Sequence, residues 1–228
     1  MATIPDRLQR VRDRISQACS RFGRPDDSVT LLAVSKTFPG VTVREAFAAG
    51  QRRFGENYVQ EGVTKIAELA DLRAEIEWHM IGPVQSNKTR VVAEHFDWVH
   101  TVDRLKVAER LSAQRPADLR PLQVCVQVNT SGEASKSGVA PAEALALART
   151  VAALPRLQLR GVMALPAPSV DPAVQRAELA AVRAVYDDLR AAGLPLDTLS
   201  MGMSQDLETA IELGSTLVRV GTALFGQR

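Results

Sequence analysis

The residues Val29-Thr30-Leu31-Leu32-Ala33-Val34 (29–34) run directly into Ser35-Lys36-Thr37, and this junction of an apolar run with a polar motif indicates the fold. A short and almost continuously apolar run is typical of a parallel strand that is covered on both faces. The runs around Val124 and Val162 have the same character. Segments with helical spacing lie between such runs, so the chain is expected to alternate strands with helices.

The chain contains eight strand-length apolar runs, one of which is 29–34, and helical segments separate them. The expected strands are 29–34, 52–54, 76–79, 98–101, 122–128, 157–163, 198–201 and 217–220. The expected helices are 41–49, 58–72, 87–95, 104–114, 141–154, 172–192 and 206–213. This order predicts an α/β protein with one domain over residues 1–228. We expect a single closed (β/α)₈ TIM-type barrel whose last strand has no following helix; an open doubly wound sheet is the alternative.

An extra helix is expected before the first strand. Apolar side chains recur at helical spacing there, at Leu8, Val11, Ile15, Ala18 and Phe22. This pattern predicts an amphipathic helix over residues 4–22 that packs on the body of the protein.

Composition excludes several classes of protein. Of 228 residues, 46% are hydrophobic and 24% charged, which is ordinary globular composition rather than that of a disordered chain. Lys and Arg number 28 against 26 Asp and Glu, so no basic surplus supports nucleic-acid binding. No apolar run approaches the roughly 20 residues of a membrane span. Cys19 and Cys125 lie far apart, which indicates neither a disulfide framework nor a zinc site and favours a reducing cytoplasm.

Polar motifs follow the predicted strands directly. They are Ser35-Lys36-Thr37, Gly55-Glu56-Asn57, His79 with Ile81-Gly82-Pro83, Asn129 to Gly138, Gly202-Met203-Ser204 and Gly221-Thr222. In a barrel these positions share the rim at the carboxyl ends of the strands, where active sites are built. The sequence therefore predicts a functional site on that rim.

Two of these motifs favour a phosphate site. Met201-Gly202-Met203-Ser204 leads into a helix that begins near Asp206, and Gly221-Thr222 adds a glycine beside a hydroxyl. The loops after strands seven and eight commonly hold phosphate in barrels, and helix starts bind anions. Each pair alone could equally form a simple turn.

Lys36 and Arg219 suggest what accompanies the phosphate. A lysine at the end of a buried strand can form an imine with an aldehyde or ketone, although its stem could instead cover apolar surface. With a phosphate site, this suits pyridoxal 5′-phosphate (PLP) or a sugar-phosphate aldolase substrate. Arg219 interrupts an apolar strand, so it either faces inward toward a partner such as a pyridine nitrogen or pairs outward with a carboxylate. His95 and His100 match no metal-binding pattern, and no metal is expected.

Several motifs together resemble the pyridoxal phosphate homeostasis protein family. They are Leu32-Ala33-Val34-Ser35-Lys36-Thr37, Phe54-Gly55-Glu56-Asn57-Tyr58, Trp78 to Lys88, Asn129 to Gly138, Leu199 to Ser204 and Gly214 to Gly226. They occur in order along nearly the whole chain. Met80 and Gln205 depart from the family pattern, where phenylalanine and an acidic residue are common.

The resemblance implies a barrel like the N-terminal domain of alanine racemase, with PLP in an imine on Lys36. It implies that Arg219 faces the pyridine nitrogen and that Asn57 lies near the ring. The phosphate would be held by three further residues, Ser204, Gly221 and Thr222.

Family members resemble intracellular carriers or regulators of PLP without an established turnover, so no catalytic residue is assigned. Apo PLP enzymes are then expected as transient partners. The alternatives are a PLP-dependent amino-acid racemase, which would add a second domain after the last strand, and a cofactor-free aldolase that forms an imine. The polar segment from Thr130 to Gly138 offers little to bury, and we expect it to form a mobile lid.

Overall fold

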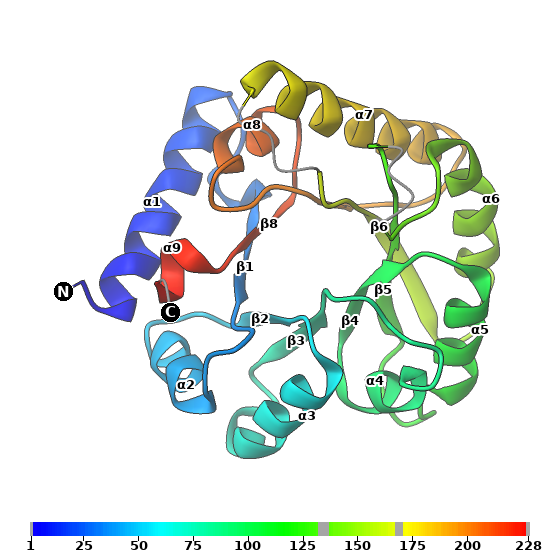
Figure 1. Cartoon of the computed structure of the whole chain (residues 1–228), viewed down its shortest axis with the longest axis horizontal. Coiled ribbons are helices and arrows are strands. Elements are labelled where there is room, and N and C mark those ends of the chain that lie inside the picture. Colours follow the sequence, from blue (N-terminus) through cyan, green and yellow to red (C-terminus); the bar gives the residue numbers. More distant parts are fainter. Residues whose placement is uncertain (1, 132–136, 167–170, 227–228) are drawn as a thin grey trace.

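The computed structural model describes residues 2–131, 137–166 and 171–226, and in it eight parallel strands close into a barrel in the order β1 to β8 (Figure 1). The strands are β1 (Thr30–Val34), β2 (Arg53–Glu56), β3 (Glu77–Met80), β4 (Trp98–Val102), β5 (Leu122–Gln127), β6 (Leu157–Met163), β7 (Thr198–Ser200) and β8 (Leu217–Val220). Because β1 pairs with β8 from Thr30↔Leu217 to Ala33↔Val220, the expected (β/α)₈ barrel is confirmed and the open sheet is wrong.

Helices follow the strands and cover the outside of the barrel (Figure 1). They are α2 (Gly40–Ala48), α3 (Val59–Glu68), α4 (Thr89–His95), α5 (Leu105–Gln114), α6 (Pro141–Ala152), α7 (Pro172–Ala191), α8 (Leu207–Glu212) and α9 (Thr222–Phe225), with short 3₁₀ turns at Asp26–Ser28 and Ala70–Leu72. Within the described ranges, no helix has the length and apolarity needed to cross a membrane.

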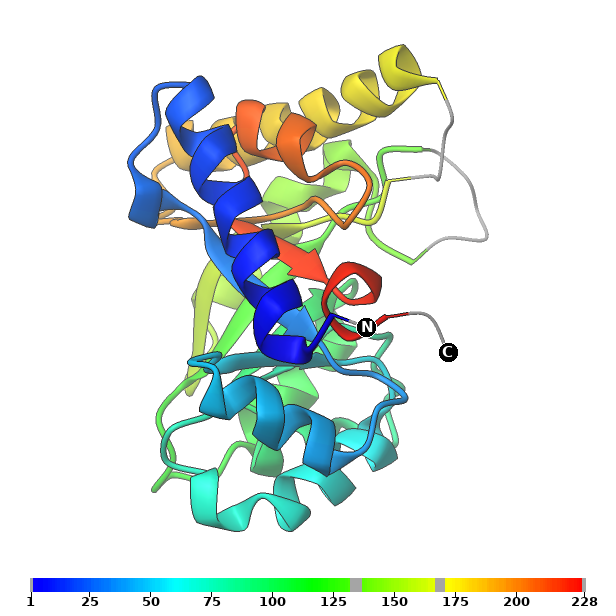
Figure 2. The ribbon, with the colours of Figure 1, turned by 90° about the vertical axis from the view of Figure 1, so that its left-hand side faces the viewer.

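The expected N-terminal helix is present as α1 (Ile4–Arg21). Thr3 and Asp6 cap its start by exchanging hydrogen bonds between side chain and backbone. The apolar stripe that includes Leu8, Val11 and Ile15 is buried. Figure 2 shows α1 lying across the barrel beside α8 and α9, which makes it part of the outer helical layer.

One expectation about the C-terminal end is wrong, because β8 is followed by the short helix α9. Leu224 and Phe225 of this helix are buried, and the Phe225 ring lies 5.1 Å from that of Phe38. Four residues make little more than one turn, so they are too few to show helical periodicity in a sequence.

Strand side chains alternate between the outside and the inside of the barrel. Outward side chains join the helices in one large core. Two small apolar clusters lie inside: Leu32, Val34, Ile81 and Leu217 form one, and Trp98, Cys125 and Met163 the other. Several polar side chains, among them Arg219, share that interior. The inside of the barrel is therefore mixed in polarity, unlike the aliphatic filling usual in such barrels.

Candidate functional site

A cavity of about 570 Å³ lies at the carboxyl ends of the strands. All six residues predicted from the sequence line it: Lys36, Asn57, Ser204, Arg219, Gly221 and Thr222. The wall also includes apolar side chains to which the sequence analysis assigned no role at the site, namely Val34, Ile81, Leu165, Pro166 and Met203. Residues from both ends of the chain thus meet in one place.

Lys36 leaves β1 through a tight turn that holds it at the cavity. The next residue, Thr37, has φ = 67°, in the left-handed region that a β-branched residue rarely adopts. Its backbone N–H donates to the Glu61 carboxylate, and its hydroxyl donates to the Lys36 carbonyl oxygen. These bonds offset the cost of the unfavourable backbone conformation, which is typical of functional sites.

A buried ion cluster supports this turn from beneath. Lys65 Nζ donates to Glu56 Oε1 (2.8 Å), to Glu61 Oε1 (2.6 Å) and to the Ser35 carbonyl oxygen (2.7 Å). The Ser35 hydroxyl also donates to Glu56 Oε1, at 2.6 Å. Burial raises the pKa of Glu56, while the charge and hydrogen bond of Lys65 partly offset that rise. The cluster joins the ends of β1 and β2 to α3. Lys36 and Asn57, which line the cavity, directly follow Ser35 and Glu56 of this cluster in the chain.

Asn57 is fixed by a close approach of two loops. A Cβ atom at Gly82 would lie 2.0 Å from the Asn57 carbonyl oxygen, so the loop after β3 can pass the loop after β2 only with glycine there. The loop after β3 therefore supports Asn57 where it borders the cavity.

Arg219 forms the floor of the cavity and is 3% exposed. Its Nη1 donates to the carbonyl oxygen and the hydroxyl of Ser200, both at 2.7 Å, and its Nη2 donates to the Ala164 carbonyl oxygen at 2.8 Å. The inward orientation is confirmed, and the outward ion pair is wrong. Burial lowers the pKa of Arg219 to about 10, so it stays charged at neutral pH. Its contacts with the described residues use three of five N–H donors, which leaves two for a ligand.

The cavity wall also carries hydroxyl groups and the residues that precede or begin two short helices. Ser204 precedes α8, and Gly221 and Thr222 begin α9. The first N–H groups of a helix have no partner within it. Arg14 holds the Ser204 loop by donating to the Ser204 carbonyl oxygen (3.2 Å) and pairing with Glu208 (2.9 Å). This part of the wall can accept an anion.

Two polar side chains near the strand ends, those of His79 and Tyr58, do not line the cavity. His79 lies inside β3, fully buried, and contacts His100 and Glu77 instead of the cavity. Tyr58 is 60% exposed. Most of the segment from Thr130 to Gly138, including Lys136, lies outside the described residues, so the lid stays a prediction.

Glu77 lies at the other mouth of the barrel, where the strands begin. It accepts from His79 Nε2 (2.9 Å) and from Arg53 Nε (3.0 Å). Burial alone would raise the pKa of Glu77, but other effects outweigh it and lower the pKa from 4.5 to about 2. They are the hydrogen bonds from His79 and Arg53, the charge of Arg53, and the charge that His79 acquires when acid protonates it. Because the pKa is lower in the folded state, the carboxylate stabilises the fold above its unfolded pKa, and this stabilisation disappears as the pH falls toward 2.

We therefore expect Glu77→Gln to lose less stability than the unaltered protein when the pH is lowered from 5 to about 2. Urea unfolding at several pH values measures this difference. Glu75→Gln, at an exposed neighbouring position, is the matched control and should follow the unaltered protein. Parallel pH profiles for Glu77→Gln and the unaltered protein would contradict the prediction.

Comparisons with known proteins agree with this geometry. Residues 7–228 match the family described as alanine racemase, N-terminal domain. The chain is 60% identical over 228 residues to the pyridoxal phosphate homeostasis protein of Pseudomonas aeruginosa, covering all of this chain and 97% of that protein. It is 56% identical over 230 residues to the protein of the same name from Escherichia coli K12, covering 98% of it. The chain belongs to the pyridoxal phosphate homeostasis protein family.

Solved structures extend the comparison to the fold. PipY of Synechococcus elongatus, solved with PLP bound, is 41% identical with a TM-score of 0.84, covering 98% of this chain and all of that one. Alanine racemase from Corynebacterium glutamicum is 18% identical with a TM-score of 0.70, covering 97% of this chain and 62% of that one. The homeostasis protein family therefore shares its barrel with alanine racemase, as the sequence predicted.

Proposed function

We propose that the protein binds PLP in the cavity and acts in PLP homeostasis in the cytoplasm, as a carrier or regulator rather than an enzyme. Residues 1–228 form a single PLP-binding barrel domain in this proposal. The observation that carries it is that Lys36 and the buried Arg219 cation line one cavity together with the hydroxyl groups of Ser204 and Thr222.

The residues present fit the chemical groups of PLP. When bound, PLP supplies an aldehyde, an electron-withdrawing pyridine ring and a phosphate. Lys36 offers the amine that can capture the aldehyde. Arg219 would donate to the ring nitrogen and, since it keeps its own proton, would leave that nitrogen unprotonated. Asn57 would border the ring, and Val34 and Ile81 would offer it apolar surface.

The phosphate takes the remaining side of the cavity. Ser204 and Thr222 offer hydroxyl donors, and Gly221 lets the backbone approach closely. A volume of about 570 Å³ lies within the range usual for small-molecule sites.

The chain's own residues favour carriage over catalysis. An unprotonated ring nitrogen, as Arg219 leaves it, makes the ring a weaker electron sink. Racemisation also needs a base on each face of the substrate, and Lys36 can serve only one. Tyr58 is exposed beside the cavity, and both ring nitrogens of His79 are occupied within the barrel. Neither is placed as a second base.

The test pairs delivery with turnover. We expect PLP-loaded protein to reactivate an apo PLP enzyme, which then serves as the transient partner. Incubation with each common amino acid should produce no racemisation, decarboxylation or transamination at enzyme rates of about 1–10³ per second. Chiral chromatography and the activity of the recipient enzyme measure the two outcomes. Steady racemisation that disappears in Lys36→Ala would establish the racemase alternative instead.

A further inference from the structure

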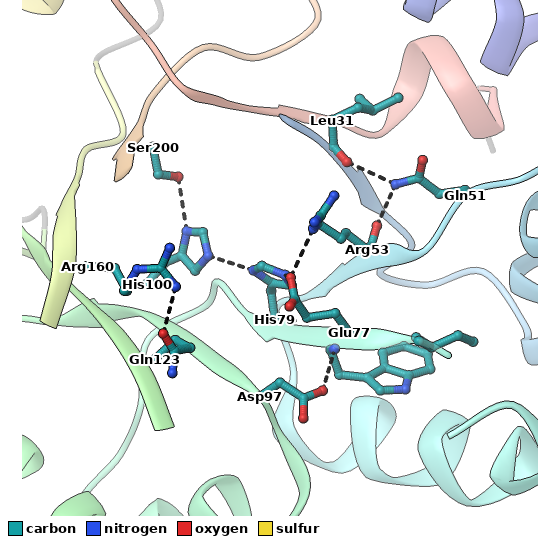
Figure 3. A network of polar contacts seen from close by, with 12 residues as sticks. Leu31, Gln51, Arg53, Glu77, His79, Asp97, His100, Gln123, Arg160 and Ser200 are labelled. Carbon is teal, nitrogen blue, oxygen red and sulfur yellow. Dashed lines mark hydrogen bonds and ion pairs between the residues drawn. The ribbon is translucent and has the colours of Figure 1, made fainter. Parts of the chain in front are cut away.

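A column of polar side chains lies inside the barrel, and Figure 3 shows four of its residues, Ser200, His100, His79 and Glu77, in a row. Arg219 Nη1 contacts Ser200 Oγ (2.7 Å), and Ser200 Oγ contacts His100 Nδ1 (3.0 Å). His100 Nε2 contacts His79 Nδ1 (2.9 Å), and His79 Nε2 contacts Glu77 Oε1 (2.9 Å). We name Ser200, His100, His79 and Glu77 the interior column.

The carboxylate end fixes the direction of every hydrogen bond. Glu77 can only accept, so His79 donates to it from Nε2. A neutral imidazole has one N–H, so His79 Nδ1 accepts from His100 Nε2, and His100 Nδ1 accepts from the Ser200 hydroxyl. Ser200 Oγ in turn accepts from Arg219, which can only donate. With both rings neutral, the column therefore has one arrangement, in which each imidazole is protonated at Nε2.

Burial favours neutral imidazoles and requires that every polar atom of the column has a hydrogen-bond partner. Ser200, His100 and His79 are fully buried, and burial lowers the pKa of both histidines. The Trp98 ring stacks on His79, with ring centroids 5.1 Å apart and planes 11° apart, and this packing restricts the orientation of that imidazole. A buried polar chain rigidifies a protein only when every member is satisfied, and all four histidine ring nitrogens are bonded here.

We propose that Ser200, His100 and His79 are positioning residues that hold Arg219 in place for the ring nitrogen of PLP. They do not line the cavity; only Arg219, at the top of the column, does so. The column fixes the orientation of the Arg219 guanidinium, so that the two N–H donors it does not use can face the ligand. Because the imidazoles of His79 and His100 are neutral, Arg219 carries the positive charge at the cavity floor. This inference rests on the proposed function for its ligand, but the column itself can be tested without PLP.

The first experiment uses PLP-free protein. Long-range ¹H–¹⁵N NMR of the imidazoles should show His79 and His100 neutral, with the proton on Nε2, at neutral pH. Ser200→Ala should shift the Nδ1 resonance of His100 and leave that of His95, on α4, unchanged. A proton on Nδ1 of His100, or a charged ring on either residue, would overturn the directed column.

The second experiment measures PLP binding. Ser200→Ala and His100→Leu should each weaken PLP binding about ten- to a hundredfold, the effect expected for one hydrogen bond to a charged group. Both should also shift the visible absorption band of the bound cofactor. His100→Gln, whose amide can both accept and donate, should restore most of the affinity and the band position. His95→Leu is the matched control for His100→Leu and should change neither quantity.

The outcomes separate this inference from the proposed function. If the unaltered protein binds PLP but Ser200→Ala and His100→Leu retain its affinity and absorption band, the positioning role is wrong and the proposed function stands. If the unaltered protein does not bind PLP, the proposed function fails and with it the positioning of Arg219 for that ligand. Because Ser200→Ala removes a single buried oxygen, it tests the inference even where His100→Leu fails to fold.

Discussion

Replacing Lys36 with alanine abolishes the covalent attachment of PLP and changes the absorption band expected of the loaded protein. An aldehyde forms a C=N bond to an amine with loss of water, and borohydride reduces that bond to a stable secondary amine. In the unaltered protein, borohydride should therefore fix the cofactor mass to the peptide that contains Lys36. Mass spectrometry of reduced, digested protein measures this directly, and the expected loss in Lys36→Ala is complete.

The matched control is Lys88→Ala, a lysine in another loop that follows a strand and does not line the cavity. It should retain both the absorption band and the site of attachment. We expect Lys36→Ala protein to hold PLP more weakly, through Arg219 and the phosphate side, and equilibrium dialysis measures its remaining affinity. An unchanged absorption band in Lys36→Ala would show that the cofactor is attached elsewhere.

Replacing Lys65 with methionine destabilises the fold by about 3–5 kcal/mol, the loss typical when one partner of a buried ion pair is removed. Lys65 is 4% exposed and Glu56 is fully buried, so the variant leaves a carboxylate without its counter-charge inside the protein. For a chain of this size the loss corresponds to a fall in Tm of about 10 °C. Urea unfolding and thermal scans measure it.

The pH dependence identifies the cause. Burial raises the pKa of Glu56, and without Lys65 little opposes that rise, so folding takes up a proton and stability falls as the pH increases. The loss in Lys65→Met should therefore be smaller at pH 5 than at pH 8, and adding Glu56→Gln should recover part of it. Lys106→Met, at an exposed position on α5, is the control. An equal loss at both pH values would assign the effect to packing rather than charge.

The barrel and its cavity were predictable because both rest on local patterns. The apolar run that ends at Lys36 marks a buried parallel strand, and the parallel order of strands brings all their carboxyl ends to one rim. Arg219 was recognisable because a cation inside an apolar strand needs a partner. These signals require no knowledge of which side chains touch.

The interior column was not predictable. Side chains on both faces of the strands are buried, so the sequence does not distinguish positions that face the barrel interior from those that face the helices. All five residues of β4 are buried, so the sequence around His100 shows no alternation that would place the imidazole within the barrel. His79 was expected at the rim for the same reason. The Lys65 cluster was not predicted: Glu56 was expected at the rim, and Glu61 and Lys65 lie four residues apart in an expected helix, where charged side chains are usually exposed.

The pairing of β1 with β8 has a consequence for how the protein becomes able to bind. Leu32 and Arg219 are partners in register across this seam, although nearly the whole chain separates them. Lys36 and Arg219 therefore come together only when β1 pairs with β8 and closes the barrel. This pairing joins residues that are far apart in the sequence, and such contacts form slowly. A partly folded chain holds one residue or the other in place, never both. Only the closed barrel can therefore bind the ligand through both residues, and bound ligand stabilises the closed barrel by mass action.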